Sequence, residues 1–389
     1  MTRTFRVLVP SAVLTVLLAL PVSAAPLAFP IPPLQGLPQG GRVPAVTAPS
    51  WILFDESTDI VLGSLNPTDS LAMASITKIM TGLIAIENTR PADLVTISET
   101  AAATGEKEID LVAGETLTMD ALFKSLMIHS ANDSATAIAE HVGGSVDGFV
   151  ALMNERAVEL GLTETSFRNP HGLDAPDHHS SALDMLNLVR AAMESQYFAD
   201  VVRSTIVVIP PAPDGTERIG TSTNLLLTGG DSRPGAPAVD PYPGSIGVKT
   251  GFTSQAQRTY VASVERDQRR LYAVIFGADE PRSHFFDAER LFDYGFGQFP
   301  YSGPIALGTP YVSTMARIEP DPLLVQGDVE TYIHLAGQGL TLEAPLPVIE
   351  SAEVEPIPIP TTEVSRSPET GPTSIVDTIT FWFDRLFNA

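Results

Sequence analysis

The chain has 389 residues, a length that favours two domains or one large domain with appendages. It contains no cysteine, which excludes disulfides, thiolate nucleophiles, iron–sulfur clusters and Cys-ligated zinc. The formal net charge of −23 argues against nucleic acid or anionic lipid as the main electrostatic partner, and 44% hydrophobic residues suffice for a packed core. Only four of the 23 basic residues are lysines, namely Lys78, Lys107, Lys124 and Lys249, so each lysine stands where arginine would be the commoner choice.

Residues 1–25 have the composition of a secretory signal peptide. A basic start with Arg3 and Arg6 precedes an apolar run over 7–20, and small residues follow it as a cleavage site. An uncleaved membrane anchor is the alternative, although the run is short and contains Pro10. We therefore expect export from the cytoplasm.

Residues 50–298 read as strands, then helices, then strands again. Short runs of strand-forming residues bounded by polar turns predict strands over 50–55, 59–64, 258–264 and 270–276. Helical periodicity begins just after Ser75 and predicts further helices over 117–129, 133–141, 183–193 and 283–294. This order predicts an α+β domain, with one antiparallel sheet and helices segregated around it.

The segments that flank this domain differ from it in composition. Residues 26–49 contain seven prolines and predict a Pro/Gly-rich spacer. Residues 299–350 carry strand patterns that predict a small β module, and 351–373 form a Pro-rich linker. Residues 374–389 place apolar residues at helical spacing, which predicts an amphipathic helix suited to peripheral membrane contact or to docking on the protein's own body.

The segment Ser75-Ile-Thr-Lys78 places a hydroxyl and an amine three residues apart at the start of a predicted helix. Positions i and i+3 share one helix face, so these two groups are expected to meet. A serine hydroxyl becomes a good nucleophile when a neighbouring base takes its proton. Lysine can be that base when burial lowers its pKa, whereas arginine stays protonated. Taken alone, however, the pattern is common by chance.

The segment Ser130-Ala-Asn132 lies in a predicted break between helices. Its hydroxyl can relay a proton, and its amide can bind a substrate carbonyl or orient the lysine. An ordinary helix cap is the alternative, since Ser and Asn are favoured there.

The segment Lys249-Thr-Gly251 offers a charge and a hydroxyl to a substrate carboxylate, and its glycine lets a substrate strand approach the backbone. A solvated strand end is the alternative. Because two of the four lysines fall in these motifs, the three motifs together are stronger evidence for a catalytic site than any one of them.

The ordered set Ser-x-x-Lys, Ser-x-Asn, Lys-Thr-Gly resembles the serine penicillin-binding proteins and β-lactamases. Further segments are similar to those of the low-molecular-mass D-alanyl-D-alanine carboxypeptidases: Phe167-Arg-Asn-Pro-His-Gly-Leu173, Ser181-Ala-Leu-Asp184, Thr223-Asn-Leu-Leu226 and Gly247-Val-Lys-Thr-Gly-Phe-Thr253. The resemblance covers about residues 50–298 and implies a β-lactamase/transpeptidase-like domain.

The resemblance also implies roles for site residues. It assigns catalysis to Ser75, Lys78 and Ser130 and substrate binding to Asn132, Lys249, Thr250, Gly251 and Phe252. Ser75 would attack the D-Ala-D-Ala bond of a peptidoglycan stem peptide, and β-lactams would acylate the same serine. Backbone N–H groups of Ser75 and Phe252 would form the oxyanion hole. No metal or other cofactor is implied.

The chain departs from the family pattern at two places. Ser130-Ala-Asn132 replaces the commoner Ser-Gly-Asn, a small change. Ala256-Gln257 stands where the family usually has Ala-Gly, and we expect the larger side chain of Gln257 to affect substrate preference.

Three other activities are consistent with parts of the pattern. A peptidoglycan DD-endopeptidase shares all three motifs. A class A β-lactamase needs a glutamate in a Glu-x-x-Leu-Asn loop, whereas the nearest match here begins with Leu183. A non-catalytic wall-binding protein would not need the full set of nominal catalytic residues.

The histidines are not expected to take part in catalysis. The pair His178-His179 is interpreted as part of a polar loop, and His171 as a residue that fixes a turn.

Overall fold

The computed structural model describes residues 44–299 and three short strands, β10 (Tyr311–Val312), β11 (Ile333–His334) and β12 (Thr341–Leu342), which pair in that order. The predicted signal peptide, linker and terminal helix lie outside the described residues, as do most of the predicted spacer and β module. No helix in the described part of the chain has the length and apolar character needed to cross a membrane.

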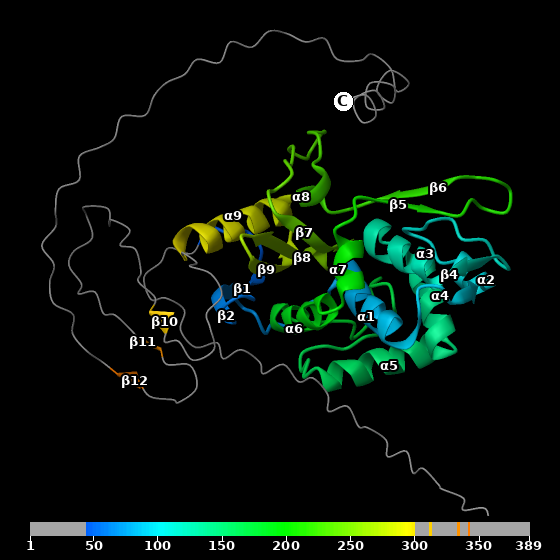
Figure 1. Ribbon diagram of the computed structural model, residues 1–389, viewed down its shortest axis with the longest axis horizontal. Coiled ribbons are helices and arrows are strands. Elements are labelled where there is room, and N and C mark those ends of the chain that lie inside the picture. Colours follow the sequence, from blue (N-terminus) through cyan, green and yellow to red (C-terminus); the bar gives the residue numbers. More distant parts are fainter. Residues whose placement is uncertain (1–43, 300–310, 313–332, 335–340, 343–389) are drawn as a thin grey trace, which may run out of the picture. The chain divides into compact units, whose positions relative to one another are not determined.

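A five-stranded antiparallel sheet runs through residues 44–299, with strand order β2-β1-β9-β8-β7 (Figure 1). Its strands are β1 (Ser50–Asp55), β2 (Ile60–Leu65), β7 (Ser245–Thr253), β8 (Gln257–Arg266) and β9 (Arg269–Ala278). The N-terminal hairpin thus pairs with the last strand of the sheet, and β7 is an edge strand. The predicted α+β arrangement with one antiparallel sheet is confirmed.

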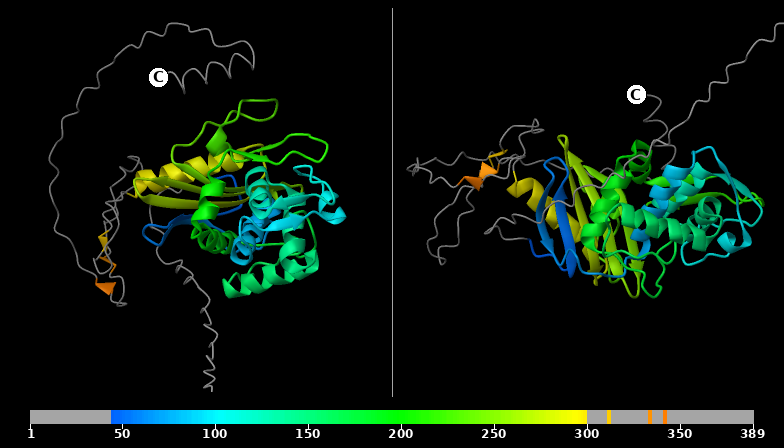
Figure 2. Two further views of the ribbon diagram at one scale, coloured as in Figure 1. Left: turned by 45° about the vertical axis from the view of Figure 1, so that its right-hand side comes forward. Right: turned by 90° about the horizontal axis from the view of Figure 1, so that it is seen from below.

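Helices cover both faces of this sheet (Figure 2). Helix α9 (Ser283–Gln298) packs on one face together with Trp51 and Leu53 of β1. Helix α6 (Ala182–Met193) packs on the other face, where Ile52 and Phe54 join the larger core. Because β1 is buried on both faces, it reads as a continuous apolar run and not as an alternation.

Most of the remaining helices form a helical lobe beside the sheet. They are the 3₁₀ helix η1 (Ala74–Thr77), α1 (Lys78–Asn88), α2 (Glu99–Ala102), α3 (Met119–Lys124), the π-helical turn η2 (Ser125–His129), α4 (Asn132–Gly143), α5 (Val146–Glu159) and α7 (Gln196–Val202). The short helix α8 (Leu225–Thr228) instead contacts β7, and its Leu226 joins the core on the α9 side of the sheet. Helix α1 is buried along its first eight residues, as expected of a helix that is apolar on most sides. This burial places the N-terminal end of α1, which carries Lys78, inside the protein.

Two short antiparallel strand pairs accompany these helices. Strand β3 (Leu94–Thr96) pairs with β4 (Thr116–Thr118), with α2 in the connection between them, and β5 (Ile206–Ile209) forms a hairpin with β6 (Arg218–Thr221).

The predicted helix over 117–129 is wrong at its start. Leu117 pairs with Val95 in the β3–β4 ladder, so the helix begins only at Met119. The hydroxyl of Thr118 accepts a hydrogen bond from the backbone N–H of Ala121, and this N-cap fixes the boundary. The last turn before the predicted break is π-helical.

Candidate active site

The Ser75 hydroxyl and the Lys78 amine lie together at the junction of η1 and α1. Side chains three residues apart in a 3₁₀ turn are eclipsed, so the chain needs no long-range contact to bring these two groups together. Lys78 Nζ is 3.0 Å from Ser75 Oγ, within hydrogen-bond distance. Lys78 is fully buried, although it carries an amine.

Two carbonyl oxygens hold the Lys78 amine on its other sides. Nζ donates to Asn132 Oδ1 at 2.7 Å and to the His171 backbone carbonyl at 2.6 Å. These oxygens can only accept, so a neutral amine would use both of its N–H groups on them. Its lone pair would then face Ser75 Oγ, which is the orientation a general base needs.

The environment also favours the neutral form of this amine. Burial lowers the pKa of Lys78 well below its ordinary value, and the charges of Lys249 and Lys107 lower it further. The carboxylate of Asp133 acts in the opposite direction. A lysine in this position loses its proton far more readily than an exposed lysine, whereas arginine stays protonated.

Ser130 and Lys249 link the second and third sequence motifs. Ser130 follows the π-helical turn η2 with a left-handed backbone (φ 74°), which lets the chain turn before α4. Lys249 Nζ donates to Ser130 Oγ and to the Thr250 carbonyl, both at 2.9 Å. Burial, and then the charge of Lys107, lower the pKa of Lys249 to about 7.

Strand β7 carries the remaining predicted residues past the serine. Thr250 Oγ1 lies 2.6 Å from Thr223 Oγ1, and Phe252 exposes 59% of its surface beside them. Gly251 lies against the backbone of Ser75. The structure therefore brings all eight predicted site residues to the end of η1, the η2–α4 break and the edge strand β7.

A side chain at position 251 is expected to damage the site. A Cβ on Gly251 would lie 2.8 Å from the Ser75 backbone nitrogen and would also clash with the hydroxyl of Thr259. Gly251→Ala should therefore displace Ser75 and lower the rate of penicillin acylation by about 100-fold or more, with a lowered melting temperature. Gly297→Ala is the matched control, because a Cβ there meets nothing within 4 Å. An unchanged acylation rate in Gly251→Ala would contradict this close approach.

Backbone groups supply contacts that the sequence motifs do not indicate. The His171 carbonyl binds Lys78, and the Gly105 carbonyl accepts from Asn132 Nδ2 at 2.9 Å. A backbone carbonyl has no signature of its own, although the 167–173 segment that carries His171 stands out in the sequence. Lys107 was also missed: it lies in an exposed loop, and its backbone carbonyl accepts from the Asn132 backbone N–H at 2.6 Å.

The two histidines that the sequence singles out are held in neutral form. The His178 side chain is buried at the end of the predicted polar loop, and its Nε2 lies 2.9 Å from Thr77 Oγ1 beneath η1. Its Nδ1 accepts from the Arg168 backbone N–H. Burial lowers the pKa of His178 to about 4 and that of His171 to about 3.

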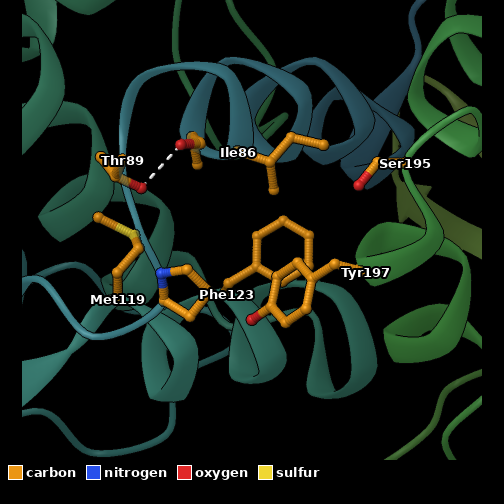
Figure 3. Close-up of a pocket in the computed structure, with 8 residues that line it drawn as sticks. Ile86, Thr89, Met119, Phe123, Ser195 and Tyr197 are labelled. Atoms are coloured by element: carbon orange, nitrogen blue, oxygen red, sulfur yellow. Dashed lines mark hydrogen bonds between the residues drawn. The ribbon is translucent and has the colours of Figure 1, made fainter.

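A separate small cavity of about 150 Å³ lies at the other end of α1 (Figure 3). The rings of Phe123 and Tyr197 form one side, and the Thr89 hydroxyl donates a hydrogen bond to the Ala85 backbone carbonyl at 2.7 Å. The side chains that line it are mostly apolar, and none belongs to the three motifs. We treat it as a packing feature of the helical lobe.

The comparisons with known proteins agree on one family. The profile described as D-alanyl-D-alanine carboxypeptidase (Peptidase S11) matches residues 38–280. The chain is 34% identical over 259 residues to D-alanyl-D-alanine carboxypeptidase DacF of Bacillus subtilis (strain 168), covering 65% of this chain and 63% of that protein. It is 32% identical over 285 residues to D-alanyl-D-alanine carboxypeptidase DacC of Escherichia coli (strain K12), covering 70% and 67%.

A solved structure has the same fold. The crystal structure of D-alanyl-D-alanine carboxypeptidase from Mycobacterium tuberculosis H37Rv matches with a TM-score of 0.61 and 29% identity, covering 68% of this chain and 97% of that one. By contrast, the matches to DacF and DacC span only about two thirds of those proteins' own lengths.

Proposed function

Because the chain belongs to the D-alanyl-D-alanine carboxypeptidase family, we propose that it is a serine-type D-Ala-D-Ala carboxypeptidase of peptidoglycan stem peptides. One observation carries the proposal. A buried lysine amine is held between two carbonyl oxygens, 3.0 Å from a serine hydroxyl and beside an edge strand.

In the first step, Lys78 takes the Ser75 proton as Ser75 Oγ attacks the carbonyl carbon of the penultimate D-alanine. The developing oxyanion would lie between the backbone N–H groups of Ser75 and Phe252, and the contact between Gly251 and Ser75 supports this placement. The peptide bond breaks as the leaving nitrogen takes a proton. Ser130, whose hydroxyl accepts a hydrogen bond from Lys249, would relay that proton.

The terminal carboxylate of the substrate would bind to Lys249 and Thr250. Lys249 would supply a charge and Thr250 a hydroxyl, and the Lys249 amine also donates a hydrogen bond to Ser130. Asn132 would hold Lys78 and contact the substrate amide. Hydrolysis of the Ser75 ester by water then releases the shortened peptide, and β-lactams would acylate Ser75 in the same way.

Product analysis on defined peptidoglycan fragments tests this function. The purified chain should release one D-alanine per stem pentapeptide, and prior incubation with a penicillin should prevent the release. Cleavage of crosslinked dimers without D-alanine release from monomers would favour the DD-endopeptidase alternative. Rapid turnover of penicillin would favour the β-lactamase alternative. If the protein neither hydrolyses penicillin nor is acylated by it, the non-catalytic wall-binding alternative is favoured.

The pKa values predict a bell-shaped pH dependence of penicillin acylation. The rate should rise with pH as Lys78 loses its proton, because only the neutral amine accepts the Ser75 proton. It should fall above pH about 7 as Lys249 loses the charge that binds the carboxylate. Lys249→Arg keeps its charge at every working pH, so the falling limb should disappear while the rising limb stays. A falling limb that persists in this variant would remove Lys249 as its origin.

We also propose that the protein acts outside the cytoplasm, and that residues 374–389 contact the membrane surface. The signal-like composition of 1–25 and the apolar stripe of the last residues support this. Deletion of 374–389 should move the protein from the membrane fraction to the soluble fraction of its own cells. An unchanged distribution would favour docking of this segment on the protein's own body.

A further inference from the structure

The residue before the proposed nucleophile has an unusual backbone conformation. Ala74 has a positive φ of 48°, in the left-handed region that residues other than glycine rarely adopt. It lies at the start of η1, so its conformation sets the direction in which the chain enters Ser75. Such a conformation persists only where the surrounding structure holds it. The contacts around Ala74 therefore help to fix the position of Ser75.

Buried hydroxyl groups hold the peptide units on either side of Ala74. The Met73 carbonyl accepts a hydrogen bond from Thr259 Oγ1 at 2.9 Å, and the Ala74 carbonyl accepts one from Thr77 Oγ1 at 2.7 Å. Thr77 and Thr259 are both fully buried. Gly172 packs directly against the Ala74 carbonyl from another side, where a side chain would not fit. The left-handed turn is thus held by side chains from two distant segments as well as from η1 itself.

The Thr77 hydroxyl has a second partner in His178, and the direction of each hydrogen bond can be assigned. The Arg168 backbone N–H can only donate, and it donates to His178 Nδ1 at 2.9 Å. Because burial lowers the pKa of His178 to about 4, the ring is neutral and its one proton lies on Nε2. This group donates to Thr77 Oγ1 at 2.9 Å, and the Thr77 proton points to the Ala74 carbonyl, which can only accept. The chain of hydrogen bonds from His178 to Ala74 therefore runs in one direction.

From this chain we infer that His178 is a positioning residue, which holds the Ala74 carbonyl through Thr77 and so orients Ser75 for attack. The inference rests on the proposed function. The role assigned to His178 concerns the acylation step alone. The groups proposed to bind the substrate carboxylate lie on β7 and take no part in this chain.

Two substitutions interrupt the chain at different points. Thr77→Val keeps the shape of the side chain but removes the hydroxyl, and His178→Phe keeps a ring but removes the Nε2–H donor. In each variant, kcat/KM for D-alanine release from a stem pentapeptide should fall by about ten-fold, since a misplaced reacting group slows a reaction by up to about 100-fold. Thr77→Ser keeps the hydroxyl and should restore most of the activity. The double variant should lose no more than the more affected single variant, because both substitutions act on one chain.

A binding measurement separates the orientation of Ser75 from general damage to the site. In the Ser75→Ala background, which cannot form the acyl ester, calorimetry gives the dissociation constant of the same pentapeptide. Adding Thr77→Val to this background should leave the constant unchanged. Weaker binding would show that the substitution distorts the whole site and would overturn the inference.

Two matched controls remove equivalent groups elsewhere. Thr89→Val removes a hydroxyl that donates to the Ala85 backbone carbonyl at 2.7 Å, at the other end of α1. His284→Phe removes a histidine that is also buried, on α9, where its ring packs against Phe285. Both controls should keep the kcat/KM of the unaltered protein.

The variants also decide against the inference if they fail to behave as one chain. It is overturned if Thr77→Val and His178→Phe leave kcat/KM unchanged, or if their losses multiply in the double variant. If His178→Phe fails to fold, nitrogen NMR spectra of the His178 ring are decisive, because a proton on Nδ1 at neutral pH would contradict the chain and one on Nε2 would support it. These results leave the proposed carboxypeptidase standing as long as the unaltered protein releases D-alanine. Absence of that release would instead overturn the proposed function, and the inference with it.

Discussion

Ser75→Ala is expected to abolish both D-alanine release and covalent labelling by fluorescent penicillin. The variant keeps Lys78 and the other site residues but has no oxygen at position 75 that can form the acyl ester, so no covalent route remains. We expect a fall in kcat of at least about 10³-fold, the scale on which removal of a catalytic nucleophile acts. Steady-state release of D-alanine and gel fluorescence after penicillin treatment measure the two effects.

Ser254→Ala is the matched control for this experiment. Ser254 lies in the exposed turn after β7. Its backbone carbonyl accepts a hydrogen bond from the Gln257 side chain, and its hydroxyl has no hydrogen-bond partner among the described residues. The control should be labelled as the unaltered protein is. Penicillin attached to a serine other than Ser75, located by mass spectrometry of the labelled peptide, would refute the assignment of the nucleophile.

Lys78→Arg is expected to be nearly as inactive as Lys78→Ala. Arginine keeps the charge and some of the hydrogen bonds, but it does not lose its proton in proteins. If Lys78 is the base, charge alone is useless and acylation should fall by about 10²-fold or more, the scale of general base catalysis. The second-order rate of penicillin acylation gives the comparison directly.

Lys124→Arg controls for the exchange of lysine for arginine in this chain. Its ammonium forms a half-buried ion pair with Asp120 at 2.8 Å on helix α3, where arginine can take its place. This variant should acylate at the unaltered rate. Robust acylation by Lys78→Arg would exclude Lys78 as the base, and the proton of Ser75 would need another acceptor.

The sequence indicates the side-chain part of the site well, and physical reasons explain why. Lysine is so rare in this chain that Lys78 and Lys249 stand out by composition alone. The i, i+3 spacing of Ser75 and Lys78 requires only a local helix, which the structure supplies as a 3₁₀ turn. Ser130 likewise falls at the break that the apolar pattern predicts between two helices.

The parts that the sequence does not indicate depend on tertiary contacts. The His171 carbonyl reaches Lys78 only because the chain returns 93 positions later, and no side chain marks it. Helix α5 has only Phe149, Met153 and Ala157 fully buried, so its pattern is weak. Strand β7 contains Gly247 and Gly251, which interrupt the apolar alternation of a strand.

The burial of Lys249 also makes the free energy of unfolding depend on pH. The lysine has a pKa of about 7 in the folded protein, whereas lysine in an unfolded chain has a pKa of about 10.4. Between these values the unfolded chain binds a proton that the folded protein does not, so the free energy of unfolding rises with pH across this range. At and below neutral pH the buried charge of Lys249 lowers the free energy of unfolding, and the carboxylate that we propose to bind beside it would offset this cost. If the carboxylate binds there, the complex should be more stable than the free protein, and the melting temperature should rise with the concentration of a carboxylate ligand.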